Sequence, residues 1–302
     1  MRTLLNLNLQ SNSPLDLQGN GDIRIIGDRG AGKTTFMAAL AYWPNGNPES
    51  SPIQSIDPFA PDTGILIEMA QNILENGQTL PPTRPGQPPL YSFIVQLKPS
   101  FWKNPREAVV GRNLRLQVSC REYAGELVDQ LRSNLDDPIL STYLDDCATA
   151  TGLLLLVDAT STYDREFAQA LTNLERELNL RLTHSNRNKR QYRIALMFSK
   201  AEQPQVWNYQ NEIPNFVKLK FPKTQQALQN WRRVWGCQVS TFFSSAFGMM
   251  GNPPQPNVRV IQNDGRGTSA VIARPKFWKP FGLVAPIYWL HTGQSDERLQ
   301  QI

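Results

Sequence analysis

The sequence predicts an α/β protein, in which a mostly parallel sheet is covered by helices on both faces as a three-layer α/β/α sandwich. Strand-like and helix-like segments alternate along much of the 302-residue chain, as this class requires. The later strand candidates, GLLLLVDAT at 152–160 and RIALMFSK at 193–200, are continuous apolar runs, which are typical of strands buried on both faces. A glycine-rich segment follows the first strand candidate, at the sheet edge where such folds bind ligands.

The individual elements follow from hydrophobic periodicity and from turn residues. Strands are expected at 22–26, 91–97, 114–120, 152–160, 193–200 and 237–246, with a hairpin at 258–273. Helices are expected at 33–42, 63–76, 125–135, 164–182, 217–235 and 283–290. The segment WPNGNP should end the first helix near Tyr42. Proline, serine and asparagine predict a loop at 44–62, and proline excludes regular structure at 81–89 because it fixes φ and lacks an N–H donor.

The composition is that of an ordinary soluble chain, with 40% hydrophobic and 19% charged residues. The apolar run at 153–157 is far too short to cross a bilayer. The first residues contain no sustained apolar region of the kind that a signal peptide needs. We therefore expect no transmembrane segment and a cytoplasmic location.

The cysteines and histidines exclude some kinds of chemistry. Cys120, Cys147 and Cys237 lie far apart and show no metal-binding spacing, so we expect reduced, mostly buried thiols. The chain has only two histidines, which leaves little room for histidine-based catalysis or for a zinc site.

The formal net charge is +5, and much of the basic excess lies at 181–193. A solvated helix end and loop explains such a run. The alternative is an anionic partner, such as an acidic protein, a membrane surface or nucleic acid. No aromatic-interleaved RNA motif accompanies the run, and the chain shows no DNA-binding motif.

The segment GDRGAGKT, Gly27 to Thr34, fits the phosphate-binding pattern G-x-x-x-x-G-K-S/T between a strand and a helix. Glycines allow positive φ and let backbone N–H groups approach phosphate oxygens, and the N-terminus of the next helix favours an anion. Lys33 can bridge the β- and γ-phosphates, and the Thr34 hydroxyl can bind Mg²⁺. The pattern predicts a P-loop NTPase, although it does not distinguish GTP from ATP. The expected nucleotide contacts are Asp28, Arg29, Gly30, Ala31, Gly32, Lys33, Thr34 and Thr35.

Three later segments, in order, resemble the Ras-like GTPases. In REYAGE the residues Glu122 to Gly125 align with the family's D-x-x-G, with Glu in place of Asp. In MFSKAE the family's N-K-x-D appears with Ser199 for Asn, Lys200 unchanged and Glu202 for Asp. In FFSSA, Ser245 and Ala246 match the short S-A motif that contacts guanine. The strand and helix around Asp158 also resemble their counterparts in small GTPases, so the resemblance covers roughly 22–250.

This resemblance implies a GTP-binding protein with slow GTP hydrolysis that acts as a molecular switch. It implies a G-domain at 1–250 with a large switch-region insertion at about 44–112, and a C-terminal hairpin and closing helix at 251–302 packed on the same domain. The expected ligands are GTP or GDP and Mg²⁺, and the expected partner is a protein effector or regulator of unknown identity. The segment FGLVAPIYWL further resembles divergent bacterial double-GTPase-type proteins of conflict-system or signalling operons.

The base-binding roles also come from the resemblance. Glu202 would accept hydrogen bonds from guanine N1–H and the 2-amino group, a bidentate pairing that the longer carboxylate can still make. Lys200 would lie along the base and the ribose. Ser199 lacks the amide that in the family ties the base loop to the P-loop, so we expect GTP preference with weaker discrimination.

The switch and hydrolysis roles fall on Glu122, Gly125 and Glu126. Glu122 would hold Mg²⁺ through water, unless it is simply an exposed acid in a loop. The Gly125 N–H would bind the γ-phosphate. Glu126 replaces the water-orienting Gln of the family, and a carboxylate beside the γ-phosphate adds repulsion, so we expect slow hydrolysis and leave a direct role open.

The resemblance also implies a threonine that binds both Mg²⁺ and the γ-phosphate and lies between the first helix and the second strand of the family fold. The candidates are Thr63, Thr79 and Thr83. Thr63 opens a predicted helix, where an N-cap is the simpler interpretation. Thr83 lies shortly before the strand at 91–97 and is therefore favoured, as a ligand of both the metal and the γ-phosphate.

Arg29 is unusual at its place in the P-loop. It either stabilises the charge that develops during phosphoryl transfer or points outward and pairs with an acid such as Asp28 or Glu126, which we favour.

Two other functions remain open at this point. A P-loop ATPase or kinase-like enzyme would use Asp158 as a Walker B aspartate, although Ala159 follows it where ATPases commonly have Glu. A hydrolysis-deficient nucleotide-binding scaffold would explain the two replaced acids, although the intact Lys33–Thr34 pair argues for a retained nucleotide.

Overall fold

A computed structural model describes residues 22–28, 30–58, 60–74, 89–99, 115–121, 127–263 and 267–300 of the chain. Its central feature is a parallel sheet of four strands in the order β1-β5-β6-β7. The strands are β1 Ile23–Gly27, β5 Gly152–Asp158, β6 Arg193–Ser199 and β7 Gln238–Phe243. Because all four run the same way, their carboxyl ends share one edge of the sheet, and β1 carries the glycine-rich segment to that edge.

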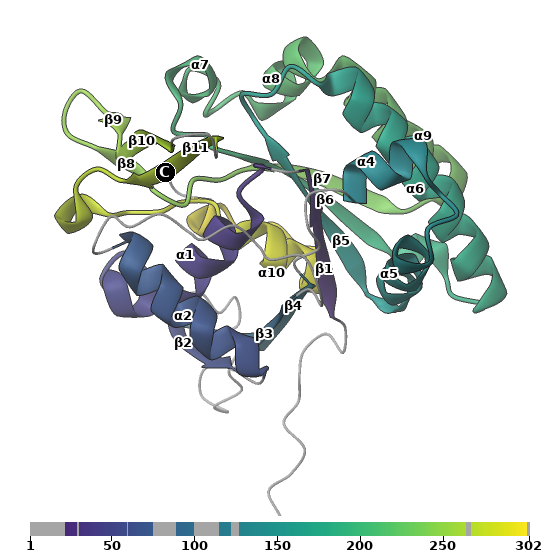
Figure 1. Ribbon diagram of the computed structural model, residues 1–302, viewed down its shortest axis with the longest axis horizontal. Helices are drawn as coiled ribbons and strands as arrows, with labels where there is room; N and C mark the ends of the chain where they lie inside the picture. Colours follow the sequence, from purple (N-terminus) through teal and green to yellow (C-terminus); the bar gives the residue numbers. More distant parts are fainter. Residues whose placement is uncertain are drawn as a thin grey trace, which may run out of the picture.

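A second, antiparallel sheet of three strands continues the first beyond β1 (Figure 1). Its strands are β2 Ile53–Pro58, β3 Leu90–Leu97 and β4 Arg115–Arg121. Side chains join the two sheets, since Gln117 Nε2 and Ser119 Oγ on β4 donate to Asp22 Oδ1 at 2.5 and 3.2 Å.

The prediction of a loop at 44–62 is wrong at Ile53–Pro58, where the structure has the strand β2. It is an edge strand that pairs only with β3, and Ile53 is its one fully buried side chain. A segment with so little apolar patterning is fixed by its partner strand rather than by its own sequence.

Nine α-helices surround the sheets in the described part of the chain. They are α1 Lys33–Gly46, α2 Pro61–Leu74, α4 Leu127–Ser133, α5 Pro138–Thr149, α6 Asp164–His184, α7 Pro204–Trp207, α8 Ile213–Lys220, α9 Pro222–Trp235 and α10 Ala285–Thr292. Helices α4, α5, α6 and α9 cover one face of the parallel sheet, and α1 and α10 cover the other (Figure 1). The predicted three-layer α/β/α arrangement with a mostly parallel sheet is therefore confirmed.

Alternate residues of β5 explain why both faces are covered. Leu153 and Leu155 pack with α6 and α9, whereas Leu154 and Leu156 pack with α1 and α10. Successive side chains of a strand point to opposite faces, so an unbroken apolar run needs helices on both sides. The hydrophobic effect thus turns this run directly into the three-layer fold.

Helix α1 continues past the point where the sequence predicted its end. It contains Pro44 and closes at Gly46, where the N–H of Asn47 bonds to Trp43 O at 3.0 Å. Pro44 lies in the last turn, so its missing N–H removes a single hydrogen bond. Trp43 is buried, and its indole N–H reaches Ser50 Oγ at 3.1 Å, which holds the last turn against the core.

Helix α5 was not predicted, although the sequence contains its signals. Asp137 caps it by accepting from the N–H groups of Ile139 and Leu140, and Pro138 opens its first turn. Its buried residues are Leu140, Tyr143, Leu144, Cys147 and Ala148, at the spacing of one helical face.

The C-terminal part adds two small antiparallel pairs and the helix α10. The pairs are β8 Met249–Met250 with β9 Gln255–Pro256 and β10 Val258–Asn263 with β11 Gly267–Ile272, and the second is the hairpin that the sequence predicted. Helix α10 has Pro286 in its first turn, and seven of its residues are buried in or beside the α1 side of the core. None of the helices described is both long and apolar enough to cross a membrane.

Candidate functional site

The glycine-rich turn after β1 has a backbone that only glycine adopts easily. Gly30 and Gly32 have φ of 77° and 84°, in the left-handed region that costs other L-residues about 1–2 kcal/mol. Apart from each glycine and the two residues that flank it, no atom of the described chain lies within 4 Å of where a Cβ would stand. The backbone conformation therefore requires glycine here, and the space beside both residues is open.

Gly27 is a glycine for a different reason. A Cβ on Gly27 would lie 2.6 Å from Leu156 O on the neighbouring strand β5. The close approach of β1 and β5 therefore explains this residue, independently of any ligand.

Lys33 folds back over the turn that precedes it. Its Nζ donates to Gly27 O at 2.8 Å and to Asp28 O at 3.0 Å, while the Ala31 N–H donates to Asp28 O at 3.2 Å. The ammonium group is thus held beside the N-terminus of α1, where the helix dipole and the first N–H groups favour an anion. Thr34 and Thr35 follow in the first turn and are half-buried.

Ser199 ties the end of β6 to the glycine-rich turn. Its Oγ lies 2.7 Å from Ala31 O and 3.2 Å from Val157 O, and its single proton can be donated to one of them at a time. Ser199 lacks the amide that makes this tie in the family that the sequence resembles, but its hydroxyl links the two loops instead. The side chain is buried, so even a short side chain spans the distance.

Lys200 is fixed by an ion pair with Asp158. Its φ of 58° is positive, which is uncommon for a residue with a Cβ and is frequent at functional sites. Its Nζ lies 2.5 Å from Asp158 Oδ2, while Asp158 Oδ1 accepts from the N–H and hydroxyl of Thr160 at 2.8 and 2.7 Å. Both oxygens of Asp158 are therefore occupied within the protein.

Glu202 is a buried acid with one unused oxygen. It is 2% exposed, its Oε1 accepts from Gln203 Nε2 at 3.3 Å, and its Oε2 has no hydrogen-bond partner among the described residues. Burial raises the pKa of the carboxyl above its ordinary value, and the Ser245 hydroxyl and the charge of Lys200 only partly oppose this shift. An unpaired buried acceptor costs about 1–3 kcal/mol of stability. A ligand that donates a hydrogen bond to Oε2 would remove this cost.

The loop after β7 is held by the C-terminal part of the chain. Ser245 and Phe281 exchange backbone hydrogen bonds of 3.0 and 3.1 Å, and Ser245 Oγ accepts from the Gly248 N–H at 2.7 Å. The indole of Trp278 donates to Ala246 O at 2.8 Å. Because the Ser245 N–H is already bonded, the amide left for a ligand in this motif is that of Ala246.

Three loops that are far apart in the sequence are thereby joined at the carboxyl edge of the sheet. Ser199 links the glycine-rich turn to the segment 199–202, and the Ala201 N–H donates to Ser244 O at 3.1 Å, which links that segment to the loop at 244–246. The structure thus brings together the predicted P-loop and two predicted base-binding segments.

Several predicted residues lie outside the described part of the chain. They are Arg29, Thr79, Thr83, Glu122, Gly125 and Glu126. The predictions for magnesium ligation, the γ-phosphate contact and hydrolysis therefore stay predictions, with Thr34 as their only described metal ligand. Among the described residues no group of three or more His, Cys, Asp or Glu side chains could hold a metal ion.

Thr63 has neither of the roles considered for it. Helix α2 begins at Pro61, so Thr63 is not its N-cap. Its side chain is buried, and its Oγ1 donates to Ser92 O and accepts from the Ser92 N–H, both at 3.0 Å. Thr63 therefore fastens α2 to β3, and its hydroxyl is fully used there.

Several arginines of the basic run at 181–193 form ion pairs and hydrogen bonds with other parts of the chain. Arg181 pairs with Asp145 at 2.8 Å and with Glu177 at 2.9 Å. Arg187 donates to two backbone carbonyls at the C-terminal end of α5, those of Ala148 and Ala150, and Arg193 donates to two at the end of α10. Cations at helix C-termini complement the helix dipole, so this run connects elements rather than forming only a solvated surface.

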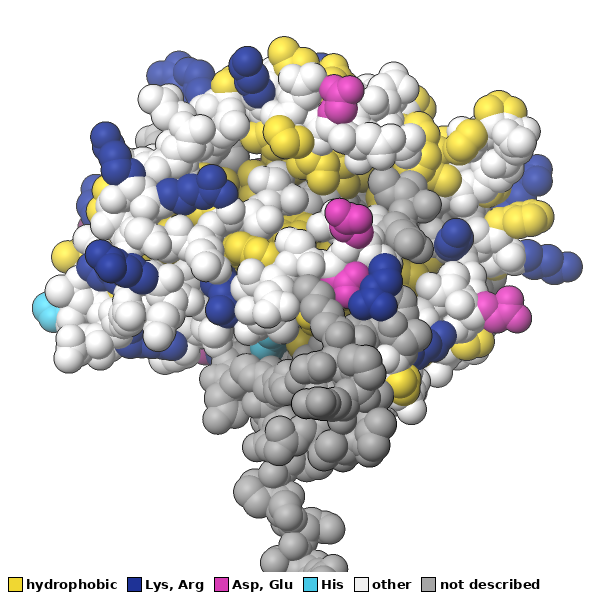
Figure 2. Space-filling view, turned by 180° about the vertical axis from the view of Figure 1, so that it is seen from behind, with side chains coloured by type: hydrophobic (Ala, Val, Ile, Leu, Met, Phe, Trp, Pro, Cys, Tyr) yellow, Lys and Arg dark blue, Asp and Glu magenta, His cyan; other side chains and the backbone are white. Residues whose placement is uncertain are grey.

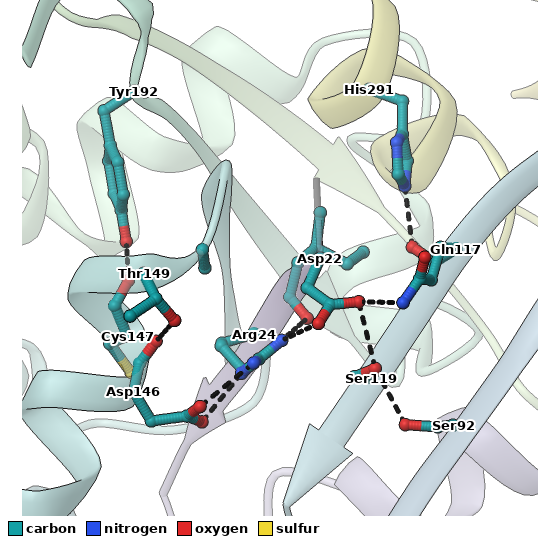
Figure 3. Close-up of polar contacts among 12 residues, drawn as sticks. Asp22, Arg24, Ser92, Gln117, Ser119, Asp146, Cys147, Thr149, Tyr192 and His291 are labelled. Carbon is teal, nitrogen blue, oxygen red and sulfur yellow. Dashed lines mark hydrogen bonds and ion pairs between the residues drawn. The ribbon is translucent and has the colours of Figure 1, made fainter. Parts of the chain in front are cut away.

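A polar network that the sequence did not predict lies at the opposite, amino-terminal end of β1 (Figure 3). Arg24 is 8% exposed and donates from Nε to Asp146 Oδ2 at 2.7 Å, and its Nη1 lies 3.3 Å from Asp22 Oδ2. Burial alone lowers the pKa of Arg24, but its hydrogen bond with Asp146 and the two carboxylate charges raise it above the ordinary value. Asp22 also joins Gln117 and Ser119, so the network connects α5, β1 and β4.

The described cysteines behave as the sequence predicts. Cys147 and Cys237 are buried and form no disulfide within the described part of the chain, and burial raises the pKa of Cys237 to about 11. The side chain of Cys120 lies outside the described residues.

A sheet whose first strand leads through GDRGAGKT into α1 defines a fold of the P-loop NTPase type. No family model matches the chain, and no curated protein is similar to it in sequence. Among solved structures, the chain is similar to the signal recognition particle receptor complex SRb-GTP/SRX from Chaetomium thermophilum, with 12% identity and a TM-score of 0.38 over 76% of this chain and 91% of that one. It is also similar to nucleolar GTP-binding protein 1 from Plasmodium falciparum, with 15% identity and a TM-score of 0.31 over 74% of this chain and 76% of that one.

Proposed function

We propose that this chain is a GTP-binding protein that hydrolyses GTP slowly and acts as a nucleotide-dependent switch. Phosphate binding is supported by the open turn at Gly30 and Gly32 and by the ammonium group of Lys33, which lies over this turn. A triphosphate would receive backbone N–H groups from this turn and from the start of α1.

The single observation that carries the choice of base is the buried, half-used carboxyl of Glu202. Guanine presents two adjacent donors, N1–H and the 2-amino group, whereas adenine presents an acceptor at N1. A carboxylate with an oxygen still able to accept a hydrogen bond is complementary to the first edge and not to the second. Pairing with guanine would also relieve the cost of the unsatisfied oxygen.

The geometry at Asp158 favours this function over the ATPase alternative. A Walker B aspartate must present its carboxylate to the hydrated metal, but both oxygens of Asp158 are bound by Lys200 and Thr160. The scaffold alternative is not favoured either, because the turn keeps both the glycine conformations and the position of Lys33 that phosphate binding needs.

The donor set proposed for Mg²⁺ consists of the Thr34 and Thr83 hydroxyls and the Glu122 carboxylate, which are the hard oxygen ligands that Mg²⁺ prefers. Thr34 lies in the first turn of α1, directly after Lys33, as this arrangement requires. When bound, the ion would neutralise charge on the β- and γ-phosphates.

We assign the remaining steps to residues of the chain as follows. Gly125 would bind the γ-phosphate through its N–H, and loss of that contact after hydrolysis would release the segment for a partner to detect. Glu126 would slow hydrolysis by charge repulsion, and Arg29 would either offset developing charge or pair with a nearby acid. The insertion at about 44–112 and the part beyond residue 250 would recognise the protein effector or regulator.

A base-exchange experiment tests the proposal. Titration calorimetry should show that the wild type binds GTP more tightly than ATP. Glu202→Gln should lose at least tenfold in GTP affinity and gain affinity for XTP, because an amide N–H can donate to the 2-carbonyl of xanthine. ATP bound more tightly than GTP by the wild type would refute the proposal, and phosphate release from GTP, measured alongside, tests slow hydrolysis.

A further inference from the structure

A groove runs between helices α6 and α9 on the outer layer of the molecule, away from the proposed nucleotide site. It encloses about 620 Å³. Its lining consists of Arg165, Ala168, Gln169, Thr172, Lys223, Gln226, Ala227, Gln229, Asn230 and Arg233. The residues from α6 recur every three or four positions, as do most of those from α9, so each helix contributes one face to the groove.

The two helices are fixed against each other at both ends, so the groove is preformed. At the first end both oxygens of Asp164 accept from the N–H groups of Lys223 and Thr224 at 2.9 Å. Toward the other end the indole of Trp235 donates to Glu175 Oε1 at 2.6 Å. Both helices start at the same end and therefore run parallel.

The charges along the groove have one sign. Arg165, Lys223 and Arg233 are exposed, and none of them forms an ion pair with an acid in the described part of the chain. The lining contains no Asp or Glu, and the nearby Asp164 has both oxygens bonded to α9. On the side of the molecule that carries α6 and α9, Figure 2 shows many Lys and Arg side chains and hardly any acidic ones.

The other side chains that line the groove are either small or able to form hydrogen bonds. Ala168 and Ala227 are half-buried, and they contribute short side chains between the two helices. The amides of Gln169 and Gln226 and the hydroxyl of Thr172 offer both donors and acceptors. A peptide backbone presents both kinds of group, so an extended chain could bond along these walls.

We propose that this groove binds an acidic peptide segment of a partner protein. Lys223 and Arg233 lie ten residues apart on α9, which is about 15 Å along a helix and matches about five residues of an extended peptide. No aromatic ring lines the groove on which a nucleic-acid base could stack. A flat lipid surface could not follow the concave floor. This activity goes beyond the proposed function and does not depend on a bound nucleotide.

Fluorescence anisotropy with fluorescein-labelled hexaglutamate tests this proposal. The wild type should bind the probe, should not bind labelled hexaglutamine, and should lose affinity as salt screens the charges. The triple variant Arg165→Glu, Lys223→Glu, Arg233→Glu should bind hexaglutamate at least tenfold more weakly. The matched control is Lys218→Glu, Arg259→Glu, Lys276→Glu, which changes the net charge equally at exposed positions outside the groove and should keep most of the affinity.

Three outcomes would overturn the proposal. They are no binding of hexaglutamate, an equal loss in the control variant, and tighter groove-dependent binding of phosphatidylserine vesicles or of a single-stranded DNA 12-mer. The groove variant should bind GTP as the wild type does, so failure here would leave the nucleotide proposal standing. Conversely, if the wild type failed to bind GTP, the proposal that the groove binds an acidic peptide would still stand.

Discussion

The hydroxyl of Ser199 lies 2.7 Å from the carbonyl oxygen of Ala31, across 168 positions of the sequence. This bond joins the end of β6 to the turn between β1 and α1. Any ligand that contacts both the turn and the segment 199–202 therefore meets two loops whose relative position is already set. Such preorganisation reduces the entropy lost on binding.

Removing this bond should weaken both the fold and nucleotide binding. We expect Ser199→Ala to lower the free energy of unfolding by about 1 kcal/mol, the usual net value of one hydrogen bond, and to weaken GTP affinity severalfold. Urea unfolding and calorimetry measure the two effects. Ser185→Ala is the matched control, because it removes a hydroxyl that bonds Arg181 O at an exposed helix end. Equal GTP affinities for both variants would show that the tie does not position the loops.

The raised pKa of Glu202 should make GTP binding depend on pH. Guanine pairs with the ionised carboxyl, so GTP affinity should rise with pH through the raised pKa of Glu202, above the ordinary value of 4.5. ATP affinity should not follow this titration, and Glu202→Gln should abolish it. Calorimetry of GTP and ATP at a series of pH values is the measurement, and parallel curves for the two nucleotides would contradict the assignment.

The same carboxyl should affect stability with the opposite sign. Its pKa is higher in the folded than in the unfolded protein, so the folded form binds the proton more strongly. Its favourable contribution is fully present below the unfolded pKa and is lost as the pH rises through the folded pKa. Without nucleotide, Glu202→Gln should therefore raise the melting temperature near neutral pH and have little effect in acid. A melting temperature unchanged at both pH values would show that the carboxyl is not destabilised by burial.

Three glycine substitutions should separate folding from phosphate binding. Gly27→Ala places a Cβ 2.6 Å from Leu156 O and should cost about 1–3 kcal/mol of stability. Gly30→Ala keeps its surroundings open but has a φ of 77°, so it should cost about 1–2 kcal/mol and weaken GTP binding at least tenfold. Gly64→Ala, in an exposed turn of α2 with open space around it, is the control and should stabilise the protein slightly. Urea unfolding with GTP titration distinguishes the three, and a Gly30→Ala variant with normal GTP affinity would remove the turn from the site.

The network around Arg24 should be structural and independent of nucleotide. Arg24→Ala leaves Asp146 and Asp22 without their cation. The side chains of these two acids are 26% and 32% exposed, so the loss should fall below the roughly 3–5 kcal/mol of a fully buried pair but exceed that of a surface pair. GTP affinity should not change, because Asp22 and Arg24 lie at the start of β1 and the turn follows its last residue, Gly27. Arg132→Ala is the control, since its pair with Asp129 is much more exposed and should contribute at most about 1 kcal/mol. Similar stability losses in both variants would contradict the role of burial.

Most of the central sheet could be predicted because its signals are local. The run at Leu153–Val157 is apolar at every position, and the pair Asp137–Pro138 that opens α5 is equally local. The edge strand β2 was missed for the opposite reason, since it has one fully buried residue and depends on its pairing with β3.

The candidate site likewise has some features that the local sequence determines and others that depend on the tertiary structure. The sequence by itself determined the turn at Gly30 and Gly32, because positive φ depends on the residue's own side chain and its immediate neighbours. The tertiary structure alone decided that Ser199 reaches Ala31, that Glu202 is buried, and that Arg187 and Arg193 bind helix ends. These contacts join residues tens to hundreds of positions apart, and burial and distance across a sheet depend on strand order, which no local propensity encodes.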